Sequence, residues 1–226
     1  MSRIAIFFLL VIAPLLAMLL ALLGVETVFS NPLGGFLLLV GLAYLVGIVI
    51  VYWIRKERFW ESSRNGATLR QERGDRSFWL ITAGMLAVFY LSPVEYLYFT
   101  ALLPRTPFMA AGGMGLVLLG VVLFIWARKT LRDNYSGHIS VKDSQTLVQS
   151  GPYRFVRHPA YTGYFLMALG ISLGYASMAG LVAVLLLLLP GMVYRINVEE
   201  TILAQHFGDA YSQYRHTTKR LIPGIW

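Results

Sequence analysis

The run IAIFFLLVIAPLLAMLLALL, residues 4–23, decides the class of this fold. As a helix rising 1.5 Å per residue, it is about 30 Å long, which matches the hydrocarbon core of a bilayer. The core of a secretory signal is shorter, about 7–15 apolar residues ahead of a small-residue cleavage site. This run instead ends in Gly24-Val25-Glu26, so we interpret it as a retained membrane span.

The rest of the chain has the same apolar character. Of its 226 residues, 57% are hydrophobic and 13% are charged, whereas about a quarter of the residues in soluble domains are charged. The sequence therefore predicts an all-α, polytopic membrane helical bundle of about six helices. The further predicted spans are 34–54, 78–100, 110–127, 160–175 and 177–195.

The formal net charge of +8 could indicate a nucleic-acid partner, but its distribution favours another explanation. Six spans place Arg3, segments 55–76 and 128–157 and the tail from Arg195 on one side. Of the 19 Lys and Arg residues, only Arg105 falls on the other side. Because basic residues mark cytoplasmic flanks, we expect a cell (inner) membrane protein with cytosolic termini, a cytosolic active site and no nucleic-acid partner.

The chain contains no cysteine, which excludes disulfides, thiolate metal sites and a cysteine nucleophile. Its histidines also lack the i, i+4 spacing typical of a zinc-binding helix. We therefore expect no metal. The four histidines are His138, His158, His206 and His216.

We divide the chain into two regions. Residues 1–127 are N-terminal membrane spans with a cytosolic connector at 55–77. Residues 128–226 are predicted to carry the chemistry, as a cofactor loop, a helical hairpin over 160–195 and a C-terminal cytosolic helix.

Two features shape the predicted hairpin. Gly170 and Gly174 have the GxxxG spacing that lets two membrane helices approach closely, so we expect them to bring the two helices of the hairpin together. Pro190-Gly191, late in its second helix, is expected to produce a kink.

The segment QTLVQSGPYRFVRHPAY, residues 145–161, is unusual for a membrane connector. Pro159 suits the first turn of a helix, which puts His158 at the helix start. Backbone N–H groups there favour an anion, and Tyr153 and Tyr161 offer aromatic faces to a cation. S-adenosylmethionine carries both charges, although an ordinary basic flank with a proline-started helix fits the same pattern.

A second constellation is Arg195 with Glu199 and Glu200, near the cytosolic end of the last span. At 100° per residue, Arg195 and Glu199 lie about 40° apart on one helix face, and Glu200 lies about 100° further round. An isolated pair of this kind is usually a snorkelling arginine in a weak i, i+4 bridge. Here the predicted hairpin brings Arg195 and Glu199 back beside His158 at the start of its first helix. This favours a binding site between His158 and these two residues.

These motifs together resemble the catalytic half of the isoprenylcysteine carboxyl methyltransferase family, particularly its prokaryotic branch, which is similar to phospholipid methyltransferases as well. The resemblance covers residues 128–226, whereas the first 127 residues are similar only in being spans. It rests on Gln145–Val148, Gly151–Arg154, Arg157–Gly163, Arg195 with Glu199-Glu200, Phe207-Gly208 followed by Tyr211 and Tyr214, and Arg220–Trp226.

The resemblance implies an S-adenosylmethionine site and assigns roles to particular residues. Arg195 and Glu199 are the implied catalytic residues, and Arg195 is the implied substrate-binding residue. The eukaryotic pattern has Gln where His138 stands and His where Gln145 stands, which puts the acceptor in doubt. The implied cofactor-binding residues are His138, Gln145, Thr146, Leu147, Val148, Tyr153, His158, Pro159, Ala160, Tyr161 and Glu199.

The expected function is methyl transfer to a lipophilic acceptor at the membrane, most simply the carboxylate of an isoprenylcysteine-like substrate. A carboxylate is already ionised at neutral pH, so Arg195 can hold it bidentately without a general base. A phospholipid amine or a small thiol must lose a proton, for which Glu199, His206 or water would serve.

Other classes of protein fit the sequence less well. A membrane NADPH-dependent sterol-type reductase shares a similar layout, but Arg157-His158-Pro159 and Glu199-Glu200 match the methyltransferase pattern better. A transporter usually shows repeats and ionisable groups at mid-membrane. Here the spans are almost free of charge, apart from Glu95 near the outer end of the third. A non-catalytic accessory membrane protein remains open, and a titration with S-adenosylmethionine would distinguish it.

Overall fold

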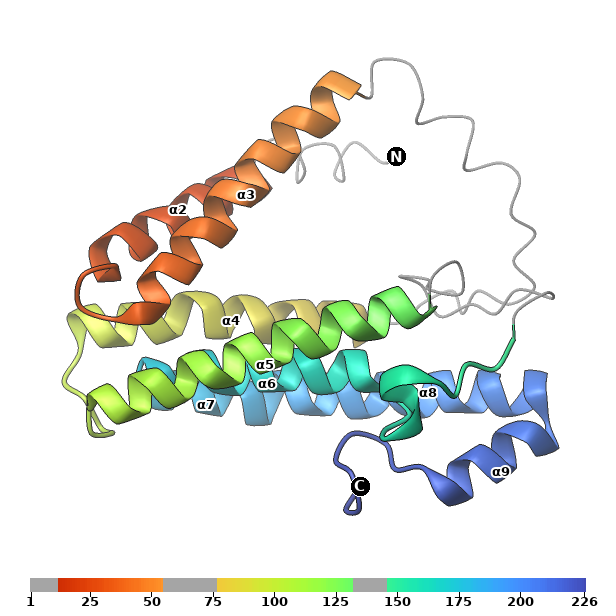
Figure 1. The fold of residues 1–226 in the computed structure, drawn as a ribbon. Coiled ribbons are helices and arrows are strands. Elements are labelled where there is room, and N and C mark those ends of the chain that lie inside the picture. The colour runs from red at the N-terminus through yellow and green to blue at the C-terminus, as the bar shows by residue number, and fades with distance from the viewer. Residues whose placement is uncertain (1–11, 55–76, 132–145) are drawn as a thin grey trace.

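The computed structural model describes residues 12–54, 77–131 and 146–226 (Figure 1). The regular elements of these ranges are helices, joined by one isolated bridge between Val156 and Lys219. The prediction of an all-α fold is confirmed. The helices are α2 (Ala13–Thr27), α3 (Pro32–Ile54), α4 (Ser77–Tyr98), α5 (Pro107–Leu131), the short η3 (Gly151–Arg154), α6 (Pro159–Gly174), α7 (Met178–Ala183), η4 (Val184–Leu188), α8 (Leu189–Phe207) and α9 (Asp209–Thr217).

The described helices are those of a membrane protein. Three of them are long and apolar enough to cross a bilayer: Trp79–Tyr98, Pro107–Leu131 and Met178–Phe207. Ala13–Thr27 and Pro32–Gly47 are shorter apolar helices. The start of the predicted first span and most of the connector 55–77 lie outside the described residues, so the count of six spans stays a prediction.

Figure 1 shows α4, α5, α6 and the α7–α8 helix running side by side, with α2 and α3 as an inclined pair. One buried cluster links these elements. It includes Leu20 of α2, Leu37 of α3, Val88 of α4, Ile171 of α6 and Leu188 of η4. Both predicted regions of the chain therefore contribute to the same core, and the division at residue 127 stays a prediction about function.

The GxxxG glycines of α6 pack against α5, so the expectation that they join the two helices of the hairpin was wrong. A Cβ on Gly113 of α5 would lie 2.4 Å from the Cα of Gly174, and one on Gly170 would lie 2.6 Å from the carbonyl oxygen of Gly113. Gly120 of α5 and Gly163 of α6 make a similar close contact nearer the start of α6. Membrane helices associate through such small residues. In α5 these residues are Gly113 and Gly120.

Near the turn of the hairpin, α7 packs closely against α6 at Gly180, where a Cβ would lie 2.7 Å from Oγ of Ser172. The turn is fixed by Glu95 of α4. The Glu95 carboxylate accepts hydrogen bonds from the Ser177 hydroxyl at 2.6 Å and from the backbone N–H groups of Met178 and Ala179. The charged residue that the sequence places in a span thus caps the start of α7.

The second helix of the hairpin runs from Met178 to Phe207 with a π-helical turn, η4, just before Pro190. Proline has no N–H to donate and crowds the preceding turn, and a π turn relieves that conflict without ending the helix. The disturbance expected at Pro190-Gly191 is therefore seen as a change of helical pitch, and the kink angle stays a prediction.

Candidate functional site

The start of α6 forms one wall of the site. Pro159 occupies its first turn and His158 is the N-cap residue, so the predicted helix start is confirmed. The N–H of Arg157 donates to the carbonyl of Lys219 at 2.7 Å, and the N–H of His158 donates to the carbonyl of Arg220 at 3.0 Å. The C-terminal segment is thereby held alongside the segment that precedes α6.

A buried carboxylate fixes this arrangement. Glu200 of α8 is 3% exposed, and its Oε1 accepts hydrogen bonds at 2.8 Å from both Nε and Nη2 of Arg157. His158 Nε2 lies 3.3 Å from the same oxygen. Oε2 of Glu200 accepts from Nε and Nη2 of Arg220, at 3.1 and 2.9 Å. Each arginine sets two nitrogens against one oxygen of Glu200. Such charge-assisted contacts are strong, so Glu200 joins α8, the α6 start and the C-terminal segment.

One turn nearer the membrane, Tyr161 joins the two residues expected to carry the reaction. Its hydroxyl accepts a hydrogen bond from Nε of Arg195 at 2.8 Å and donates to Oε2 of Glu199 at 3.0 Å. Arg195 and Glu199, expected on one face of the helix, thus share Tyr161 as a hydrogen-bond partner, and their functional roles stay predictions. The ring of Tyr161 also lies 5.8 Å from the ring of His158, centroid to centroid.

Helix α9 supports the loop ahead of α6. The Tyr214 hydroxyl donates to the carbonyl of Tyr153 in η3 at 2.5 Å. Tyr211 is 1% exposed, and among the described residues its hydroxyl has no hydrogen-bond partner. Burial, with a further contribution from the negative charge of Glu200, raises the pKa of the Tyr211 hydroxyl, and burial likewise raises the pKa of Tyr214. Both hydroxyls therefore stay protonated at neutral pH.

The structure brings most of the predicted site residues together. Tyr153 lies in η3, and His158, Pro159, Ala160 and Tyr161 lead into α6. Of these, Tyr161 contacts both Arg195 and Glu199. Thr146, Leu147 and Val148 lie in the irregular stretch before η3. His138 and Gln145 lie outside the described residues. His206, the alternative base, is exposed near the end of α8, where its ring contacts Phe207.

Sequence reasoning missed the Glu200 cluster. Arg157 and Arg220 were recognised only as parts of motifs, and Glu200 only by its angle on the helix. The available signal was the Glu199-Glu200 pair itself. Two adjacent helical residues point about 100° apart, so the second carboxylate was expected on a different side of α8 from the first.

The side chains around Tyr161 fit an S-adenosylmethionine-like group. His158 as N-cap accepts no N–H through its side chain, which leaves the first N–H groups of α6 available to a carboxylate. The rings of His158 and Tyr161 and the carboxylate of Glu199 supply aromatic and negative surface to a cation. No group of three or more His, Asp or Glu side chains suited to a metal occurs in the described ranges.

Comparison with known proteins finds matches to two related kinds of methyltransferase. Residues 108–210 match the family model described as phospholipid methyltransferase. The chain is 33% identical over 114 residues to the protein-S-isoprenylcysteine O-methyltransferase of Schizosaccharomyces pombe, covering 50% of this chain and 48% of that protein. It is 32% identical over 138 residues to the Xenopus laevis enzyme of the same name, covering 58% and 48%. The chain thus spans about half the length of these curated relatives.

A solved structure shares the fold. It is that of a eukaryotic intramembrane Ras methyltransferase, an isoprenylcysteine carboxyl methyltransferase, and the match covers 93% of this chain and 74% of that one. The TM-score is 0.55 and the sequence identity is 21%. Because it covers 93% of the chain, the structural match also includes most of the helices before residue 108, where the match to the family model begins.

Proposed function

We propose that this chain belongs to the isoprenylcysteine carboxyl methyltransferase family and that it transfers a methyl group from S-adenosylmethionine to a lipophilic carboxylate. The acceptor class that fits best is an isoprenylcysteine-like molecule, and the working partners are a prenylated or similar small acceptor and membrane lipid. Tyr161, Arg195 and Glu199 lie within residues 108–210, which match the family model described as phospholipid methyltransferase.

The observation that carries this proposal is the Tyr161 hydroxyl between Arg195 and Glu199. It holds a guanidinium and a carboxylate at a fixed spacing, one on each side of a phenol. We assign Glu199 to the cofactor and Arg195 to the anionic acceptor. The bound cofactor would supply the methyl group on a sulfonium, and the residues of the chain supply position.

Methyl transfer to a carboxylate requires alignment more than acid–base chemistry. Arg195 is 9% exposed. An acceptor carboxylate bound to it would therefore be shielded from water, with its negative charge paired with the guanidinium. Alignment of two bound reactants removes the entropic part of the barrier, and exclusion of water strengthens the electrostatic interactions. None of these residues has to move a proton when the acceptor is a carboxylate.

The proposed location follows from the helices. Arg195 and Glu200 both lie in the long helix Met178–Phe207. Glu200 is nearer the C-terminal end of that helix, and α9 and Arg220 follow it in the chain. A lipophilic acceptor would keep its chain among the membrane helices with its carboxylate at Arg195. We propose that the end of α8 that carries Arg195 and Glu200 faces the cytosol at the cell membrane, because Lys and Arg residues are enriched on the cytosolic side of membrane spans.

The test is methyl transfer from radiolabelled S-adenosylmethionine by purified protein in lipid nanodiscs. Three acceptors are compared: an S-farnesyl cysteine derivative with a free carboxylate, its carboxamide, and a phosphatidylethanolamine. We expect label on the carboxylate as a base-labile ester. Label on the phospholipid amine alone would replace the proposed acceptor by the alternative one. Absence of cofactor binding by a folded sample would favour an accessory protein.

A further inference from the structure

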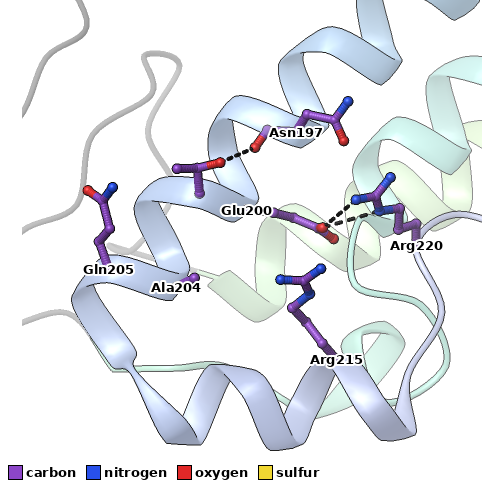
Figure 2. Close-up of a pocket in the computed structure, with 7 residues that line it drawn as sticks. Asn197, Glu200, Ala204, Gln205, Arg215 and Arg220 are labelled. Carbon is purple, nitrogen blue, oxygen red and sulfur yellow. Dashed lines mark hydrogen bonds and ion pairs between the residues drawn. The ribbon is translucent and has the colours of Figure 1, made fainter.

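A polar pocket lies on the side of α8 that faces away from Tyr161. Its volume is about 430 Å³, and Figure 2 shows it between α8, α9 and the segment that carries Arg220. Helix α8 supplies one wall, α9 supplies Arg215, and the C-terminal segment supplies Arg220. The lining residues are Asn197, Glu200, Thr201, Ala204, Gln205, Arg215 and Arg220.

This pocket is separate from the proposed methyl-transfer site. At 100° per residue, Asn197, Thr201 and Ala204 fall within about 60° of one another on α8, and they lie roughly opposite the face of Arg195 and Glu199. Glu200 stands between the two faces. A ligand in the pocket would therefore contact α8 from the side that does not face Tyr161.

The pocket carries an uncompensated positive charge. The single carboxylate in its lining, Glu200, is already occupied by Arg157, His158 and Arg220. The side chain of Arg215 has no ion-pair or hydrogen-bond partner among the described residues, and Figure 2 shows it extending from α9 into the space between α8 and Arg220. With two arginines against one glutamate, the lining keeps a net charge of +1 (2 − 1 = +1).

We propose that this pocket binds a phosphate group, with the Arg215 guanidinium as its principal contact and Arg220 as a second cation. Arginine presents a planar fork of donors that matches phosphate geometry. The side chain of Asn197 supplies a neutral donor from α8. The phosphate comes either from an anionic lipid headgroup at the membrane surface or from a free phosphate, and the same chemistry serves both sources.

The experiment compares two neighbouring charge-removing variants of the full chain. Arg215→Gln removes the unpaired guanidinium from the pocket. Lys219→Gln removes the same charge from an exposed side chain four residues away that does not line the pocket. Replacing the Arg215 side chain leaves its backbone carbonyl, which accepts from Arg157 at 3.3 Å, in place.

Two measurements distinguish the sources of the phosphate. Calorimetric titration of detergent-solubilised protein with inorganic phosphate, against chloride at matched ionic strength, reports a free phosphate. Native mass spectrometry of protein extracted from phosphatidylglycerol-containing nanodiscs reports a retained anionic lipid. In at least one of the two, we expect Arg215→Gln to weaken binding about ten-fold and Lys219→Gln to change it less than about two-fold.

Two results would overturn the proposal. One is equal behaviour of the two variants in both measurements, because it would show only a diffuse effect of net charge. The other is a wild-type protein that binds neither inorganic phosphate nor phosphatidylglycerol. Titration of the same samples with S-adenosylmethionine keeps this test separate from the proposed function, since the pocket proposal stands or falls without cofactor binding.

Discussion

The hydroxyl of Tyr161 joins Arg195 to Glu199, accepting from the first at 2.8 Å and donating to the second at 3.0 Å. Tyr161 comes from the start of α6, whereas Arg195 and Glu199 lie on consecutive turns of α8. The contact therefore closes the hairpin at its polar end. It also sets the distance between the residue assigned to the cofactor and the residue assigned to the acceptor.

Tyr161→Phe tests this link. The phenylalanine keeps the ring beside His158 but removes both hydrogen bonds, so Arg195 and Glu199 become free to change rotamer. Hydrogen bonds to charged groups contribute about 1.5–3 kcal/mol each to stability, so we expect the melting temperature to fall somewhat and methyl transfer by the folded protein to slow about 10- to 100-fold. Tyr194→Phe is the matched control, because Tyr194 lies on α8 with its side chain half exposed. Equal rates for the two variants would show that the hydroxyl of Tyr161 has no positioning role.

Glu200→Gln tests the buried carboxylate. The substitution keeps the shape of the side chain and leaves Arg157 and Arg220 without their counter-charge. Breaking a buried ion pair from one side costs several kcal/mol, and we expect the free energy of unfolding to fall by about 3 kcal/mol. Because Glu200 ties down the C-terminal segment, backbone amides of Leu221 and Ile222 should also exchange faster with deuterium.

Glu26→Gln is the control for that change, since Glu26 is exposed and accepts a hydrogen bond from Tyr98 at the other end of the bundle. Its free energy of unfolding should change by less than about 1 kcal/mol. A Glu200→Gln protein as stable as the Glu26→Gln protein would mean that the cluster contributes little to the fold.

Gly113→Ala tests the close approach of α5 and α6. A methyl group there would lie 2.4 Å from the Cα of Gly174, so the helices must separate, at a cost of about 1–3 kcal/mol in the free energy of unfolding. Gly112→Ala is a neighbouring control, because a Cβ on Gly112 meets no atom within 4 Å. Thermal unfolding in detergent should show a lower midpoint for Gly113→Ala alone. An unchanged midpoint would mean that the two helices tolerate a wider separation.

The orientation of the chain in the membrane is a further prediction. All Lys and Arg residues except Arg105 fall on one side of the six-span layout, so both termini and segment 55–77 should be cytosolic. Arg105 stacks on Tyr96 and donates to the carbonyls of Glu95 and Phe99. Reporter fusions at each terminus and within 55–77 give the measurement. A reporter at 55–77 that is active outside the cytosol would contradict the layout.

Short sequence patterns were enough to predict where helices lie, where α6 begins and which residues share a helix face. Pro159 predicted the start of α6 because the fixed φ of proline and its missing N–H suit a first helical turn. The i, i+4 spacing of Arg195 and Glu199 predicted that they would lie on one face of the helix. Apolar runs predicted the helices, since every backbone polar group in a bilayer must be satisfied within the segment.

Features that depend on packing could not be predicted in the same way. The GxxxG spacing of Gly170 and Gly174 showed that a helix would come close but not which one, and α5 proved to be the partner through Gly113. The partners of Glu200 lie 43 and 20 residues away in the chain, at Arg157 and Arg220. Their meeting depends on how the hairpin and the C-terminal segment return, which no local pattern encodes.

The central claim is that one site has a cofactor side at Glu199 and an acceptor side at Arg195. The most direct test pairs two measurements, S-adenosylmethionine affinity by calorimetry and methyl transfer to an S-farnesyl cysteine carboxylate, on Glu199→Gln, Arg195→Ala and Arg195→Lys. We expect Glu199→Gln to weaken cofactor binding about ten-fold. Arg195→Ala should leave cofactor affinity within about two-fold while slowing transfer at least 100-fold, and Arg195→Lys should recover only part of the rate. Equal loss of cofactor affinity in Glu199→Gln and Arg195→Ala would contradict the separation of roles.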